Sequence, residues 1–126
     1  MVKNNYVLDI ELALKEGKLP SDLLGMILTF LDFKSAEIRI YNLLLKNSLT
    51  IKDIEEKLGI SERTIRKYID RLDKNGLITK KVEQGKRLRY VYAAVAPREV
   101  WNKLENRIQR MLGEVTKVLE SKAFLL

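Results

Sequence analysis

The middle of the sequence constrains the fold more than any other part, because its helix start and stop signals follow one another so closely. Thr50 with Asp53 three residues later is a weaker version of the capping box, and Gly59 is typical of a helix C-terminus. Ser61 then supplies a new N-cap almost immediately, and Gly76 marks the next stop. The spacing predicts two short helices joined by a tight turn.

An earlier helix is predicted over residues 36–46, with Ser35 as its N-cap. Apolar residues recur at helical spacing in all three segments: Ile38, Tyr41, Leu44 and Leu45, then Ile51, Ile54 and Leu58, then Ile65, Ile69 and Leu72. Three amphipathic helices in succession predict a small helical core.

Two short segments rich in β-branched and aromatic residues follow, over residues 77–82 and 88–93. The five residues between them include Gly85, Lys86 and Arg87, which predicts a β-hairpin with a basic tip. Four of the five tyrosines, Tyr41, Tyr68, Tyr90 and Tyr92, lie in periodic segments, so we expect them to pack rather than to stack on bases. The predicted fold class is mainly α with a small β-hairpin: a helix-turn-helix with a wing.

The positive charge of the chain is concentrated in this region. The net charge is +7, and residues 61–92 hold ten basic and four acidic residues, an excess of 10 − 4 = +6. Clustered positive charge favours a polyanionic partner, because phosphate neutralisation releases condensed counterions. Together with the predicted helix-turn-helix and wing, this charge leads us to expect double-stranded DNA as the partner.

The absence of cysteine and histidine limits the reactions and metal sites that this chain can support. Disulfides, thiolate nucleophiles, imidazole bases and the usual zinc sites all need one of these residues. No spaced carboxylate pair stands out either, so we expect neither an enzyme nor a metal or cofactor site.

The candidate DNA-binding residues lie in two places. A helix fits the major groove and a hairpin reaches neighbouring phosphates or the minor groove, so the third helix should read bases and the hairpin should contact backbone. Ser61 is first a helix cap, although amide groups beside it are also suited to hold a phosphate. We expect Arg71 to meet phosphate rather than bases. The full predicted set is Ser61, Arg63, Thr64, Arg66, Lys67, Arg71, Lys86, Arg87 and Arg89.

Residues 34–94 resemble winged-helix transcription regulators, especially the small archaeal TrmB-like and leucine-responsive-regulator-like groups. The resemblance is carried by Leu58-Gly59-Ile60-Ser61-Glu62-Arg63-Thr64-Ile65-Arg66, by Leu72, by Gly76-Leu77-Ile78 and by Gly85-Lys86-Arg87. Ala96-Pro97-Arg98-Glu99-Val100-Trp101 resembles the junction to a long C-terminal helix, which in such regulators implies helix-mediated dimers. Larger relatives carry a sugar-binding domain after the winged helix; none fits here, so the resemblance implies no effector.

A helix is predicted from Pro97 to about Lys122, with an apolar seam at Trp101, Leu104, Ile108, Met111, Val115 and Val118. The spacing of 3, 4, 3, 4 and 3 is a heptad pattern, which predicts that two copies pair through this helix into a homodimer. The pattern does not distinguish parallel from antiparallel pairing of the two helices. The alternative is an amphipathic helix that folds back on its own domain. A symmetric dimer would prefer an inverted repeat in DNA.

At the other end, Val7–Lys15 alternates like a strand but consists largely of helix formers, and a helix is favoured there. Ser21 is a candidate N-cap for a helix over residues 22–32. The predicted division is 1–33 as a helical extension, 34–94 as the winged helix-turn-helix and 95–126 as the dimerisation helix.

No secretory signal or apolar run long enough to cross a membrane is present, so a cytoplasmic protein is expected. The expected function is sequence-preferring transcription regulation. Two alternatives remain open: a DNA-coating or chromatin-like protein with little sequence preference, and a winged-helix module that binds only protein.

Overall fold

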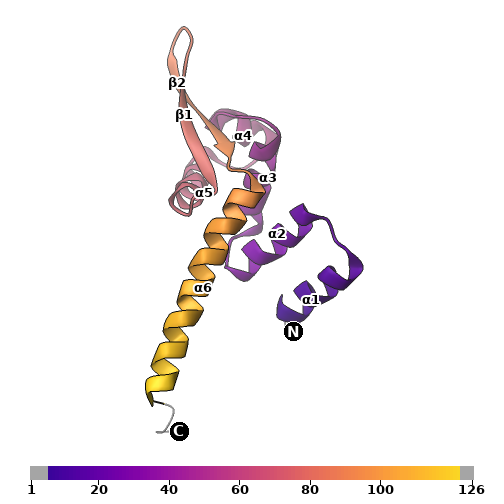
Figure 1. Ribbon diagram of the computed structural model, residues 1–126. Helices are drawn as coiled ribbons and strands as arrows, with labels where there is room; N and C mark the ends of the chain where they lie inside the picture. Colours follow the sequence, from indigo (N-terminus) through magenta and orange to yellow (C-terminus); the bar gives the residue numbers. More distant parts are fainter. Residues whose placement is uncertain (1–5, 123–126) are drawn as a thin grey trace.

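The computed structural model describes residues 6–122 (Figure 1). Its elements in chain order are α1 (Tyr6–Glu16), α2 (Pro20–Phe30), α3 (Ser35–Lys46), α4 (Ile51–Leu58), α5 (Glu62–Lys74), β1 (Ile78–Gln84), β2 (Leu88–Ala94) and α6 (Pro97–Lys122). The expected mainly helical winged fold with one hairpin and a long C-terminal helix is confirmed.

The hydrophobic core lies between α3, α4, α5 and the base of the hairpin. The predicted α5 stripe of Ile65, Ile69 and Leu72 is buried, as are Ile54 of α4 and Leu44 of α3. Leu45 is exposed instead of buried, because residue 44 already occupies the inward position on that turn. Three helix faces converge on one small core, as the periodicity indicated.

The turn between α4 and α5 has the predicted caps. The Thr50 hydroxyl accepts a hydrogen bond from the Asp53 amide, and the Thr50 amide donates to the Asp53 carboxylate, both at 3.1 Å. These bonds hold the pKa of Asp53 below its usual value, the backbone bond being the larger cause. Gly59 ends α4 at φ +65°, a left-handed conformation that favours glycine. Ser61 then caps α5 by accepting from the Thr64 amide at 3.3 Å.

The hairpin pairs Ile78 with Ala94 at its base and Gln84 with Leu88 at its tip. Leu49 adds a bridge to Tyr92, with reciprocal backbone hydrogen bonds of 2.8 and 3.0 Å. This bridge joins the α3–α4 connection to β2, and no local sequence pattern predicts it.

The tyrosines divide between core and surface. Tyr41 is buried and donates a 2.7 Å hydrogen bond to the Val95 carbonyl, and burial raises its pKa to about 12. Tyr92 is also buried. The packing prediction is wrong for Tyr90, which is 53% exposed beneath the Lys80 ammonium, 3.9 Å from the ring centroid. Tyr90 pairs with Val82 on the projecting half of the hairpin, where no core is available to cover it.

The N-terminal helices differ from expectation at their start positions. The helix favoured at residues 7–15 is present as α1, but α2 begins at Pro20, one residue before the predicted Ser21 cap, with Leu19 at the N-cap position. Proline suits a first-turn position because its missing N–H would be unpaired there. Similarly, α3 begins at Ser35 and its N-cap is Lys34, whose amide donates to the Glu37 carboxylate at 2.8 Å.

Helix α2 is packed into the same core as the winged helix, through Leu24, Leu28 and the following Phe33. Helix α1 packs mainly against α2. The expected extension at residues 1–33 therefore contains a helix that belongs to the core.

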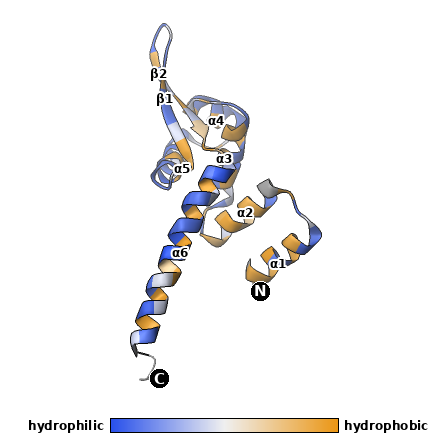
Figure 2. Cartoon of the chain, in the orientation of Figure 1, coloured by the Kyte–Doolittle hydropathy of each residue, from blue (hydrophilic) through white to orange (hydrophobic). Residues whose placement is uncertain are grey.

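Helix α6 leaves the domain as a rod (Figure 1). Its first turns pack on the core, where Val100 and Leu104 are buried. Farther along, apolar and charged residues alternate on an exposed helix (Figure 2). No helix within residues 6–122 is long and apolar enough to cross a membrane.

Candidate nucleic-acid interface

The outer face of α5 carries exposed cations because its inner face is fully used by the core. Ile65, Ile69 and Leu72 point inward, so Arg63, Arg66 and Lys67 fall on the solvent side of the same cylinder. Thr64 is half-buried beside them. Four of the predicted contacts thus come together over the first turns of one helix.

These cations differ in how they are held. The Arg66 guanidinium bonds the Glu62 carboxylate at 2.8 Å, one helical turn earlier. Within residues 6–122, the side chains of Arg63 and Lys67 have no ion pair. Arg63 and Lys67 are four residues apart on a helix, so they are neighbours and offer two uncompensated charges. Any other group that bonded the Arg66 guanidinium would have to displace Glu62.

The amino end of α5 is largely satisfied by the protein itself. Glu55 of α4 accepts a 3.0 Å hydrogen bond from the Glu62 amide, and Ser61 occupies the Thr64 amide. Two of the first three amides are therefore already bonded, and the Glu55 carboxylate stands where a phosphate would bind. This arrangement fixes the turn between the two helices and disfavours the expected phosphate contact beside Ser61.

The tip of the β-hairpin, the wing, projects beyond the helices (Figure 1). Lys86 and Arg87 are exposed there, and no ion pair involves either side chain in the described part of the chain. Arg89 is held by the Glu83 carboxylate across the hairpin, at 3.1 Å from its Nε, and this bond raises the pKa of Arg89. The two residues at the tip are thus freer to contact DNA than Arg89.

Arg71 is only partly exposed, and its guanidinium is bonded to the protein itself. Its guanidinium bonds the fully buried Glu37 carboxylate at 2.6 Å and the Asp32 carbonyl at 3.0 Å. It also lies 4.7 Å from the centroid of the Phe33 ring. These contacts use its charge and donors to join α5 to α3, so its placement does not support the predicted phosphate contact.

The long-helix seam is divided by the domain boundary. Leu104 is 4% exposed and belongs to the core, and Ile108 is half-buried beside Leu31, Phe33 and Met111. Beyond that point Met111, Val115 and Val118 are exposed, joined by Leu112 and Leu119, which the heptad spacing did not include. The alternative in which the helix packs on its own domain is thus correct at Leu104, whereas the C-terminal part of the helix remains uncovered.

No group of acidic residues within residues 6–122 is arranged to hold a metal ion. The features gathered so far are a capped helix-turn-helix, a basic helix face and a basic wing.

Comparison with known proteins identifies this arrangement. Residues 28–98 match the model of the family described as "Sugar-specific transcriptional regulator TrmB". The match spans more than half of the chain. The chain belongs to the TrmB family. It is accordingly a DNA-binding transcription regulator of the winged helix-turn-helix type, and not an enzyme.

Solved structures agree with this TrmB-family fold. A possible transcriptional regulator from Methanosarcina mazei matches with a TM-score of 0.63 at 11% identity, covering 72% of this chain and 80% of that one. An ArsR-like transcriptional regulator from Rhodococcus matches with a TM-score of 0.51 at 20% identity, covering 80% and 91%. At these identities the likeness concerns the fold alone. No match was found among curated proteins.

Proposed function

We propose that this TrmB-family regulator works as a homodimer that places α5 in the DNA major groove and the wing on neighbouring backbone or in the minor groove. The observation that carries the binding mode is the pair of uncompensated cations on α5, Arg63 and Lys67, combined with the free basic wing tip. Arg66 joins them after releasing Glu62, and arginine suits guanine because it bonds two acceptors at once. Thr64 lies within reach of the same groove.

The dimer is supported by the exposed end of α6. We call the residues Met111, Leu112, Val115, Val118 and Leu119 the distal stripe; each is about half exposed. Contiguous exposed apolar surface of this kind marks interaction sites in soluble proteins. A two-fold dimer would carry two copies of α5 and would favour a pseudo-palindromic site.

Selection of bound duplexes from a random pool at about 150 mM salt tests this proposal. We expect an enriched inverted repeat, and we expect Arg63→Ala and Arg66→Ala each to relax the preference at a defined position, costing about 1–3 kcal/mol per lost bidentate contact. Arg110→Ala is the matched control, because it removes the same charge from the side of α6 opposite the distal stripe. Binding without enrichment would indicate a DNA-coating protein, and no binding would indicate a protein-interaction module.

The contribution of the wing is measured separately by salt dependence. Lys86→Ala with Arg87→Ala should reduce the slope of log K against log salt by up to about 2, because each lost phosphate contact removes nearly one released counterion. The enriched sequence itself should not change. Lys117→Ala with Arg110→Ala loses equal charge away from the wing and should leave the slope unaltered. An unchanged slope for the wing variant would place the wing outside the interface.

A further inference from the structure

An apolar groove lies between the N-terminal helices and the start of α6. Helix α1 contacts α2, and α2 contacts α6, which leaves a hollow of about 600 Å³ between α1 and α6. Its lining is apolar except for Arg98, and includes Ile10, Leu14, Leu23, Ile27 and Trp101. Leu14 at its edge is 61% exposed. The groove therefore presents apolar surface that nothing in the described chain covers.

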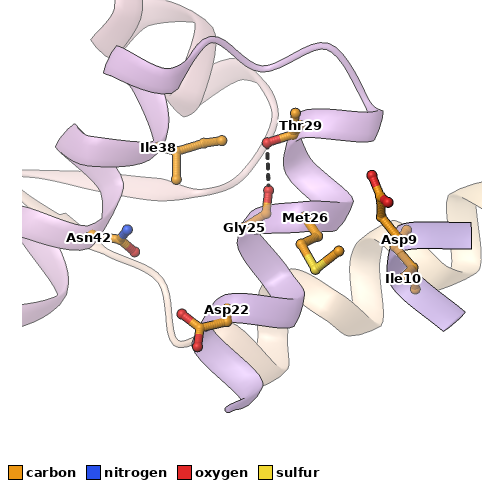
Figure 3. A pocket seen from close by; sticks show the side chains of 8 residues that line it. All are labelled: Asp9, Ile10, Asp22, Gly25, Met26, Thr29, Ile38 and Asn42. Atoms are coloured by element: carbon orange, nitrogen blue, oxygen red, sulfur yellow. Dashed lines mark hydrogen bonds between the residues drawn. The ribbon is translucent and has the colours of Figure 1, made fainter. Parts of the chain in front are cut away.

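The hollow on the other side of α2 has a different character. Figure 3 shows this space of about 480 Å³ lined by α1, α2 and α3, with the carboxylates of Asp9 and Asp22 and the polar groups of Thr29 and Asn42. Such a lining is suited to water. Of these two hollows beside α2, the one facing α6 is the one suited to an apolar occupant.

The same chain carries an apolar surface that needs a partner, the distal stripe. It cannot enter its own groove, because Trp101 lines the groove and Met111 begins the stripe ten residues later on one continuous helix, about 15 Å away. Figure 1 shows α6 running away from the domain over this length. A groove and a stripe that cannot meet within one chain can meet between two.

Interface size favours this pairing over contact between the two stripes alone. The stripe spans nine residues, about 13 Å of helix. A standard stable interface uses roughly 20–30 residues from each partner. Five half-exposed side chains fall well short of that number, whereas the groove and the exposed Val7, on the same side of α1 as Leu14, supply further apolar surface.

The net charges of α1 and α6 also favour packing of the stripe into the partner's groove. Helix α1 has three acidic residues and one basic residue, a balance of −2 (Asp9, Glu11 and Glu16 against Lys15). Helix α6 has six basic and four acidic residues, a balance of +2 (Arg98, Lys103, Arg107, Arg110, Lys117 and Lys122 against Glu99, Glu105, Glu114 and Glu120). Opposite net charges favour contact between α1 and α6, and like charges disfavour contact between two α6 helices.

We propose that the distal stripe of one protomer packs into the α1–α2–α6 groove of its partner, with the exchange repeated by two-fold symmetry. This inference rests on the homodimer of the proposed function and specifies what each stripe contacts. It makes the N-terminal helices a part of the dimer interface and places them next to the junction between the winged helix and α6.

Disulfide cross-linking tests this arrangement directly, because the natural chain has no cysteine. Full-length Leu14→Cys is co-expressed with Met111→Cys, Val115→Cys or Val118→Cys in turn, which scans the register over two helical turns. After mild oxidation, the linked peptides are identified by mass spectrometry. A disulfide requires Cβ atoms about 3.5–4.5 Å apart, so it reports direct contact. Gly113→Cys, within the same length of α6 but on its opposite side, is the matched control.

We expect at least one position of the stripe to link to residue 14 at tenfold or more the yield of the Gly113→Cys control. Links that join only like positions, such as 115 to 115, would overturn the groove assignment while leaving the dimer intact. A dimer in light scattering with no link to residue 14 would also overturn it. A monomeric mass for the unmodified protein would overturn both this inference and the proposed dimer.

Discussion

Arg71→Met is expected to destabilise the fold by about 3–5 kcal/mol, because it leaves the Glu37 carboxylate buried without its counterion. Small domains have a total stability of about 5–15 kcal/mol, so much of the folding free energy is at risk. Urea unfolding followed by circular dichroism measures the change. The second carboxylate oxygen of Glu37 already has no hydrogen-bond partner within the described residues, which leaves little compensation available.

Arg66→Met is the matched control for this stability prediction. Its ion pair with Glu62 measures 2.8 Å, against 2.6 Å for Arg71 with Glu37, but both of its partners are exposed, and exposed pairs contribute about 0–1 kcal/mol. The double variant Glu37→Leu with Arg71→Met should recover much of the loss, because it removes the unpaired charge. If the free energy of unfolding of Arg71→Met equals that of the unmodified protein while DNA affinity falls tenfold, Arg71 contacts phosphate. Its stabilising role as the counterion of Glu37 is then refuted.

Val115→Lys combined with Val118→Lys is expected to convert the dimer to a monomer. The two ammonium groups would have to be buried in an apolar contact, which is costly whether the stripe meets the partner's groove or another stripe. Loss of bivalent binding should weaken affinity for an inverted repeat by about 10²–10⁴-fold. Light scattering gives the mass, and titration of a labelled duplex gives the affinity.

Asn106→Lys with Gly113→Lys adds the same charge to the other side of α6 and serves as the control. At 100° per residue these positions lie opposite the stripe, and both are exposed. The control should remain dimeric and should bind DNA at least as tightly, because it adds positive charge. An unchanged dimer for the stripe variant would show that α6 does not mediate association.

Local signals in the sequence determined most of the secondary structure. The caps at Thr50 and Ser61 and the glycine stop at Gly59 depend on residues within a few positions of one another, so they act in any tertiary setting. The hairpin and the 26-residue α6 follow from similarly local patterns. The outward face of α5 follows from the apolar positions that fix its inward face.

One local pairing was present in the sequence and bears on the site. Glu62 and Arg66 are four residues apart, a spacing typical of helical ion pairs, and the structure contains this pair. Reading the cations of α5 together with the acids one turn away would have separated Arg66 from the uncompensated Arg63. It would not have separated Lys67, because Asp70 lies three residues after it and pairs with Lys74 in the structure.

Other features were decided only by the tertiary structure, because each joins groups far apart in the sequence. Arg71 and Glu37 are 34 residues apart, and nothing local distinguishes Arg71 from a surface cation. Leu49 and Tyr92 form a sheet bridge across 43 positions. The heptad pattern likewise could not show where the domain ends along α6, so it gave Leu104 and Val115 the same role.

The sequence by itself determined where α4 and α5 start and stop, which face of each helix is apolar and where positive charge collects, since these depend on neighbouring residues. The tertiary structure alone decided which charges are neutralised by distant partners and which apolar faces remain uncovered. Both depend on what packs against a residue, and in this chain that neighbour comes from a distant segment or, as we propose for the distal stripe, from a second copy.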